Sequence, residues 1–210
     1  MSVEDGRKVR GQRSREAILT HAVSLASIDG LGGLSLGRLA EAAGVSKSGF
    51  FAHWRDKEQL QLDTIDWARR QWVEHVVTPA FQHPAGVRRL YALHQSRLRF
   101  YADGVLPGGC FFFVAQVEFD DRPGPVQVQV AKAMADWLAV LRTQAERAIE
   151  LGELAGIDPG QLAYEMEALG EAAVTHARLL DRDTAFTYAR RAVLQRLRAH
   201  ATDPSLLPED

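Results

Sequence analysis

The sequence has 210 residues, of which 46% are apolar, so the chain can bury a sizeable core as one domain or two small ones. A formal net charge of −2 excludes a uniformly basic nucleic-acid-coating protein, and the one cysteine, Cys110, excludes an internal disulfide framework and predicts a reducing, cytoplasmic setting. We expect neither a signal peptide nor a membrane span, because no apolar run follows the basic N-terminus or reaches roughly 18 residues.

Charge is distributed unevenly along the chain. From Arg7 to Lys57, nine Lys or Arg stand against four acidic residues, whereas beyond Glu58 there are sixteen basic and twenty acidic residues. A basic N-terminal part on an acidic body is the asymmetry expected if only that part meets phosphates.

The first expected elements are a polar arm and a helix. The arm, Met1–Gly11, contains three basic residues and either contacts DNA or is an unused tail. From Ser14, apolar residues recur at helical spacing as far as Asp29. Arg13 and Arg15 at the start of this helix are candidates for phosphate contacts; the alternative is that both are simply solvated.

The segment Ser35–Leu60 predicts three short helices joined tightly. Ser35, Ser46 and Asp56 are small polar residues of the kind that satisfies free N–H groups at helix starts. Gly44 can adopt the left-handed backbone that turns the chain sharply between the first two helices. Two short helices about such a turn are typical of a helix-turn-helix, whose second helix enters the DNA major groove.

This segment resembles the DNA-binding domain of the TetR family of bacterial transcriptional regulators. Family members often carry Tyr where this chain has Phe51, which has no hydroxyl to bind a phosphate. The matching residues belong to the turn, the helix after it and the Lys-Glu stretch that follows: Gly44, Val45, Ser46, Lys47, Ser48, Phe50, Phe51, His53, Trp54, Lys57, Glu58 and Leu60.

Phosphate neutralisation would supply most of the affinity of such a domain, and side chains at base edges its specificity. Lys47 is assigned to phosphate or guanine and Phe51 to a sugar or a thymine methyl. The alternatives are a solvated Lys47, a core Phe51, and a His53 packed beneath Trp54. Phe50 and Trp54, four apart on one helix face, are assigned to the core. The full predicted DNA contact set is Ser35, Arg38, Ser46, Lys47, Ser48, Phe51, His53 and Lys57.

Helical periodicity continues beyond the predicted DNA-binding segment. We expect helices over residues 56–79, 84–102, 108–119, 126–152, 159–180 and 184–199. The aromatic run 111–117 is compatible with a strand, but a helix is preferred because no partner strand is nearby. The predicted fold class is all-α, with about nine helices. The N-terminal arm and three-helix helix-turn-helix domain cover residues 1–58, a helical effector-binding and dimerisation domain covers 59–204, and a tail covers 205–210.

A second stretch supports the same resemblance. Gly-Gly-Cys-Phe at 108–111 and Glu-Phe-Asp-Asp-Arg-Pro-Gly-Pro-Val at 118–126 resemble the C-terminal domain of one large TetR subgroup. The family resemblance implies a homodimer joined through its last two helices. The alternative is that these helices pack only within one chain. The predicted interface consists of apolar and small residues at helical spacing: Leu162, Met166, Leu169, Ala173, His176, Leu180, Ala189, Val193 and Leu197.

The resemblance also implies a small-molecule effector bound in the helical domain. An excess of aromatic residues with few polar groups is compatible with an apolar pocket, although a plain helical core has the same composition. The pocket candidates are Trp67, Tyr91, His94, Tyr101, Phe112, Phe113, Glu118 and Trp137.

The predicted function is that of a DNA-binding transcriptional regulator, a repressor released from a palindromic operator by its effector. The alternative is a helical protein-binding or scaffold module that does not bind DNA. Catalysis is not expected, because the sequence has no Gly-x-Ser-x-Gly, no phosphate-binding Gly-rich loop and no His-Glu-x-x-His motif. We expect neither a metal nor a cofactor. The predicted partners are operator DNA, an effector and a second copy of the chain, with no membrane.

Overall fold

The computed structural model describes residues 3–44, 50–51 and 53–209. The described part is helical and contains no strand, apart from an isolated bridge between Leu154 and Ala201. The predicted all-α class is therefore confirmed, and the aromatic run 111–117 is helical rather than extended. Among the described helices, none is both long and apolar enough to cross a bilayer.

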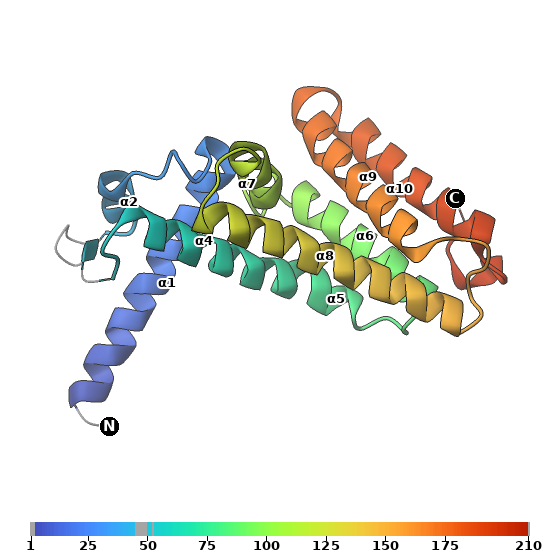
Figure 1. Ribbon diagram of the computed structural model, residues 1–210, viewed down its shortest axis with the longest axis horizontal. Helices are drawn as coiled ribbons and strands as arrows, with labels where there is room; N and C mark the ends of the chain where they lie inside the picture. Colours follow the sequence, from blue (N-terminus) through green and yellow to red (C-terminus); the bar gives the residue numbers. More distant parts are fainter. Residues whose placement is uncertain (1–2, 45–49, 52, 210) are drawn as a thin grey trace. The chain divides into compact units, whose positions relative to one another are not determined.

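The elements follow one another in the order drawn in Figure 1: α1 (Val3–Asp29), α2 (Leu36–Ala42), α4 (Lys57–Trp72), the π-helical η1 (Val73–Val77), α5 (Thr78–Ala80), α6 (Val87–Ala102), α7 (Phe111–Phe119), α8 (Pro125–Glu150), α9 (Pro159–Leu179), α10 (Arg182–His200) and the 3-10 turn η2 (Pro204–Leu206). They form two compact units. Unit 1 comprises Met1–Arg70 and Leu106–Ala131, and unit 2 comprises Gln71–Val105 and Lys132–Asp210. This grouping differs from the predicted contiguous division after residue 58, because α7 packs against α1.

Helix α1 begins at Val3, whereas the sequence predicted a polar arm to Gly11 and a helix from Ser14. Arg, Lys, Gln and Glu are good helix formers, so a polar segment can extend a helix whose later turns are anchored by packing. The anchor lies in the second half of α1, where the side chains of Ile18 and Val23 are fully buried.

One predicted helix start, Asp56, is held by a side-chain cap, and a cap that was not predicted is found at Asp181. Asp56 Oδ1 accepts the N–H of Gln59 at 2.8 Å before α4. Ser35 occupies the N-cap position of α2 but makes no capping hydrogen bond through its side chain. Asp181 caps α10 by accepting the N–H of Thr184 at 2.8 Å. Small polar residues therefore marked the starts of these helices correctly, although Ser35 does not cap in the expected way.

In unit 2, α6 packs against η1, α5, α9 and α10, and α9 runs alongside α10 (Figure 1). Leu90, Leu93 and Val193 are fully buried in the core between these elements. Leu207 belongs to the same core, so the segment predicted as a tail over 205–210 is packed on unit 2 as far as this residue. Each such aliphatic side chain contributes about 1.5–3 kcal/mol when it is fully buried.

Candidate nucleic-acid interface

The predicted turn after α2 is formed at Gly44. Leu39 and Ala40 fix α2 in the core, and Gly44 follows with φ +64°. A Cβ at Gly44 would meet no atom within 4 Å, so the backbone conformation and not crowding calls for glycine at this position. The predicted contact residues Ser46, Lys47 and Ser48 come directly after the turn and lie outside the described residues.

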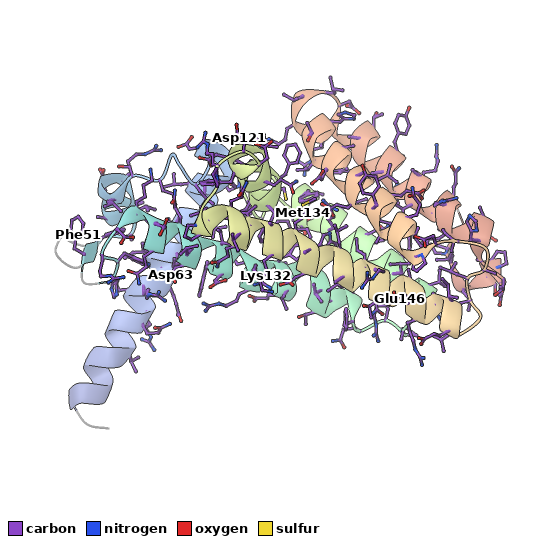
Figure 2. All side chains as sticks on the ribbon, viewed as in Figure 1. Phe51, Asp63, Asp121, Lys132, Met134 and Glu146 are labelled. Atoms are coloured by element: carbon purple, nitrogen blue, oxygen red, sulfur yellow. The ribbon has the colours of Figure 1, made fainter. Side chains whose placement is uncertain are left out.

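The two aromatic residues that follow have opposite environments. Phe50 is 1% exposed and packs on Trp54, which is also 1% exposed, with ring centroids 5.1 Å apart. The assignment of Phe50 and Trp54 to the core is therefore confirmed. Phe51 is 54% exposed and projects away from the helices (Figure 2). The structure thus leaves the Phe51 ring on the surface and does not place it in the core.

Trp54 is held by a carboxylate of helix α4. The indole Nε1–H of Trp54 donates to Asp63 Oδ2 at 2.6 Å, and the guanidinium of Arg15 forms an ion pair with the same oxygen. The Cζ atom of Arg15 also lies 5.4 Å from the centroid of the Trp54 ring. Arg15 therefore contacts this cluster in the free protein and is not simply solvated. Asp63 was missed by the sequence analysis, because no local pattern distinguishes it from a solvated acid.

His53 is half-buried and contacts the edge of Trp54, with ring centroids 5.5 Å apart. Burial lowers the pKa of His53 below its ordinary value of 6.5, and the positive charge of Arg15 lowers the pKa further. In the free protein, His53 is therefore neutral at pH 7. The neutral ring can offer a phosphate a hydrogen bond.

The remaining predicted contact residues lie on the surface of unit 1. Ser35, Arg38 and Lys57 are all exposed. Arg38 Nη1 pairs with Asp29 Oδ2 at 3.0 Å, and Lys57 Nζ donates to the carbonyl oxygen of Gly32. Exposed pairs of this kind are worth only about 0–1 kcal/mol, so both cations can be transferred to a phosphate at little cost.

Glu118 contacts the turn between α1 and α2. Its Oε1 accepts the backbone N–H of Gly32 at 2.8 Å and lies 3.3 Å from Arg122 Nη1. Helix α7 therefore contributes a carboxylate to the same unit as the helix-turn-helix. The sequence assigned Glu118 to a ligand pocket, whereas these contacts tie it to the backbone beside α2.

The eight predicted pocket residues are divided equally between the two units. Trp67, Phe112, Phe113 and Glu118 belong to unit 1, where the Nε1–H of Trp67 donates to Thr20 Oγ1 at 3.2 Å. Tyr91, His94, Tyr101 and Trp137 belong to unit 2. His94 and Tyr101 are buried and Trp137 is half-buried, while Tyr91 lines a surface groove.

Unit 2 contains a buried polar cluster that the sequence analysis did not find. Arg97 and Glu167 form a bidentate ion pair, with Nη1–Oε2 at 2.6 Å and Nη2–Oε1 at 3.1 Å. Arg97 Nε–H also donates to the hydroxyl of Tyr101 at 2.8 Å, and Trp137 Nε1–H donates to Glu167 Oε2 at 2.5 Å. Gly170 leaves room for the guanidinium, because a Cβ at this position would lie 2.3 Å from Arg97 Nη1.

Most residues of the predicted dimer interface are enclosed within the chain and are corrected here to core positions. Leu162, Met166, Ala173, Ala189, Val193 and Leu197 are all buried, and Leu169 packs against the same core. The helical spacing identified the face of α9 and α10 that packs inward, which sequence alone does not separate from an interface between copies. His176 and Leu180 are exposed. The large apolar side chains exposed on these helices and the connection between them are Tyr164, Leu179, Leu180 and Tyr188.

The described part of the chain gives no sign of a metal centre. Within it, no three His, Cys, Asp or Glu residues come together in a way that could hold a metal ion. Cys110 is buried, and its Sγ accepts the N–H of Phe113 at 3.5 Å at the start of α7.

Comparison with known proteins identifies both halves of the chain. The family model described as "Bacterial regulatory proteins, tetR family" matches residues 18–63. A second family model, described as "Tetracyclin repressor-like, C-terminal domain", matches residues 86–193. No curated protein matches the chain. The finer subgroup suggested by the Gly-Gly-Cys-Phe stretch stays a prediction.

Solved structures share the fold over most of their length. A TetR transcriptional regulator from Chloroflexus aurantiacus J-10-FL is 26% identical with a TM-score of 0.84, over 91% of this chain and 98% of that chain. A TetR-family regulator from Cytophaga hutchinsonii is 20% identical with a TM-score of 0.80, over 92% and 98%. AibR, in complex with isovaleryl coenzyme A and operator DNA, is 20% identical with a TM-score of 0.66, over 84% and 96%.

The matched C-terminal family region covers more than half of the 210 residues, and the N-terminal match covers the described part of the helix-turn-helix. These matches also confirm that the chain is a regulator and not an enzyme. The chain belongs to the TetR family of DNA-binding bacterial transcriptional regulators.

Proposed function

We propose that this chain is a repressor that binds a palindromic operator as a homodimer and leaves it when a small-molecule effector binds. The observation that carries the proposal is the contrast between Phe51 and its neighbours. Phe50 and Trp54 are buried in the core, while Phe51 stays 54% exposed at the place of the family's recognition helix. A segment fixed on one side and open on the other is suited to insertion into a major groove.

The proposed contacts combine phosphate binding with base readout. Lys47, Arg38 and Lys57 supply positive charge, and neutral His53 supplies a hydrogen bond. Ser35, Ser46 and Ser48 bind phosphate or base edges, and Phe51 contacts a sugar or a thymine methyl. In the free protein, Arg38 and Lys57 form only exposed contacts, which a phosphate can replace.

Dimerisation follows from the size of the DNA-binding unit. A single module buries roughly 600–1,000 Å², whereas two copies one helical turn apart read a pseudo-palindrome. The proposed interface comprises His176 and the exposed apolar side chains of Tyr164, Leu179, Leu180 and Tyr188. It replaces the predicted interface residues that the structure places in the core.

Release requires an effector that binds one conformer of the dimer better than the other, since equal binding shifts no population. AibR supports this part of the proposal, because that relative is solved with both a small molecule and operator DNA. Repression follows if the conformer that fits the operator is the one disfavoured by the effector.

DNA binding is tested by fluorescence anisotropy with the promoter fragment upstream of the chain's own gene. Lys47→Ala is expected to weaken binding at least tenfold and to reduce the slope of log affinity against log salt by about 1. Lys132→Ala is the control, because Lys132 pairs with Asp136 on the surface of α8. Equal affinity of the Lys47 variant and the wild type would contradict the assigned role of Lys47. Absence of salt-dependent DNA binding by the wild type would favour a protein-binding module.

The interface is tested by light scattering after size exclusion. Leu179→Glu with Leu180→Glu is expected to yield monomers, because each exposed leucine is replaced by a charge in the proposed interface. Leu162→Ala is the contrasting variant, which should lower the free energy of unfolding and leave the oligomeric state unchanged. A wild type that is monomeric at working concentrations would overturn the proposal of a dimeric repressor.

A further inference from the structure

A groove of about 370 Å³ lies along helix α6 within unit 2. Arg88, Tyr91, Gln95 and Arg99 line it from one stripe of α6, at helical spacings of three and four residues. His83 and residues 206–208 of the C-terminal segment also line the groove. Its volume is at the lower end of the range for small-molecule sites, which is about 300–1,000 Å³.

The polar lining favours negative charge. Two guanidinium groups, Arg88 and Arg99, stand with His83 in the groove, and none of the described lining residues is Asp or Glu. Within the described part of the chain, neither arginine forms an ion pair or a side-chain hydrogen bond. Guanidinium groups bind carboxylates and phosphates through paired N–H donors, so each of these two groups is available to an anion.

Gln95 adds a donor that the protein itself does not use. Its Nε2 is buried and has no hydrogen-bond acceptor among the described residues. A buried donor without an acceptor costs about 1–3 kcal/mol, and in native proteins such groups call for an explanation. The Gln95 side chain lines the groove between Arg88 and Arg99 along α6, so a rotation of its amide would bring this donor to an oxygen atom of a molecule in the groove.

Apart from Ser96, the other lining residues are apolar. Ala92 of α6 and Leu207 of the C-terminal segment are buried, and Leu206 and Pro79 also line the groove. The C-terminal wall is held in place, because Arg198 Nη1–H donates to the carbonyl oxygen of Pro208 at 2.6 Å. A ligand that had a charged group but no apolar part would leave these apolar side chains in contact with water.

We propose that the groove binds a small organic anion, with a carboxylate or phosphate head on one of the two arginines, Arg88 or Arg99, and a short apolar body against Leu206 and Leu207. Of the residues assigned to a pocket from the sequence, only Tyr91 belongs to this groove. The proposal concerns binding to the full-length protein in the absence of DNA. It therefore succeeds or fails independently of operator binding.

The first test compares four probes that share one alkyl chain, octanoate, octyl phosphate, octanol and octylamine, by isothermal titration calorimetry and by amide shifts in NMR spectra. At least one anion is expected to bind tenfold or more tightly than both octanol and octylamine, and to shift amides of α6 and residues 206–208. The preferred anion identifies the head group. Equal binding of octanol, tighter binding of octylamine, or no binding of either anion at 5 mM would overturn the proposal.

The second test separates recognition from folding. Arg88→Gln with Arg99→Gln should weaken the preferred anion at least tenfold, whereas Arg142→Gln with Arg147→Gln, two exposed arginines of α8, should leave its affinity within twofold. Gln95→Leu should also lower the affinity for the anion. It should raise the urea midpoint of the free protein, because it removes an unsatisfied donor. Undiminished anion binding by the Arg88→Gln, Arg99→Gln double variant would contradict the proposal. Because both substitutions are on the surface, this double variant still tests the proposal if Gln95→Leu does not fold.

Discussion

The indole N–H of Trp54 donates a hydrogen bond of 2.6 Å to Asp63, a residue of α4 that also pairs with Arg15 of α1. Trp54 is the last aromatic residue of the segment that follows Gly44, so its side chain fixes the end of that segment to two helices. We therefore expect the Asp63 carboxylate to influence how the proposed DNA-binding segment is held.

Asp63→Ala is expected to lower both stability and DNA affinity. The substitution leaves the indole N–H of buried Trp54 without its acceptor, which costs about 1–3 kcal/mol. Asp63→Asn retains an oxygen acceptor for Trp54 and loses only the ion pair with Arg15. Its stability and DNA affinity should therefore fall less than those of Asp63→Ala. Urea unfolding and anisotropy with promoter DNA measure the two effects.

Asp121→Ala is the matched control for these variants, because Asp121 is an exposed acid of the same unit (Figure 2). Its free energy of unfolding should stay within about 0.5 kcal/mol of the wild type. If Asp63→Ala matches Asp121→Ala in both measurements, Asp63 does not position the DNA-binding segment.

Local sequence signals were sufficient for most of the helical elements. Apolar spacing predicted α9 and α10 closely, and the structure adds that Asp158 and Asp181 both accept a backbone N–H at the start of these helices. The start of α1 was missed because polar residues are compatible with both an exposed helix and an arm, and spacing cannot choose between them.

Contacts between distant residues could not be predicted from one sequence. Arg97 and Glu167 are 70 residues apart, and Glu118 binds Gly32 from 86 residues away. An apolar stripe likewise shows which face of a helix is buried, but not whether the same chain or a second copy buries it. Leu162 and Val193 were for this reason assigned to an interface and are found in the core.

Removing Arg97 alone should be strongly destabilising. Arg97→Met leaves Glu167 buried without its cation, and breaking a buried pair in this way costs about 3–5 kcal/mol. The double variant Arg97→Met with Glu167→Gln should recover part of this loss, because Gln is neutral and can still accept from Trp137 Nε1. A double-mutant cycle by urea unfolding checks the coupling. Losses that add within about 0.5 kcal/mol would show that the two side chains act independently.

Gly170→Ala should destabilise the protein although Ala is the better helix former by about 1 kcal/mol. Its Cβ would lie 2.3 Å from Arg97 Nη1, so the guanidinium would have to leave its position on Glu167. Gly11→Ala in α1 is the control, since nothing lies within 4 Å of a Cβ there, and it should be neutral or stabilising. If Gly170→Ala raises the thermal midpoint as Gly11→Ala does, the space beside Gly170 is not needed by Arg97.

His94 should make the protein sensitive to acid. Burial lowers the pKa of His94 from its ordinary value of 6.5 to about 3, assisted by the positive charge of Arg97, although its hydrogen bond to the carbonyl oxygen of Ala189 acts in the opposite direction. Between these two pH values the unfolded chain binds a proton at His94 and the folded chain does not. The stability contributed by neutral His94 is therefore complete above pH 6.5 and falls as the pH drops towards 3, with a slope approaching about 1.4 kcal/mol per pH unit.

The variant His94→Gln tests this pH dependence, because Gln keeps a donor for Ala189 and does not titrate. In urea unfolding from pH 7 to 4, its free energy of unfolding should fall less steeply than that of the wild type. Parallel pH profiles for the two proteins would mean that His94 takes up its proton equally well in the folded and unfolded states.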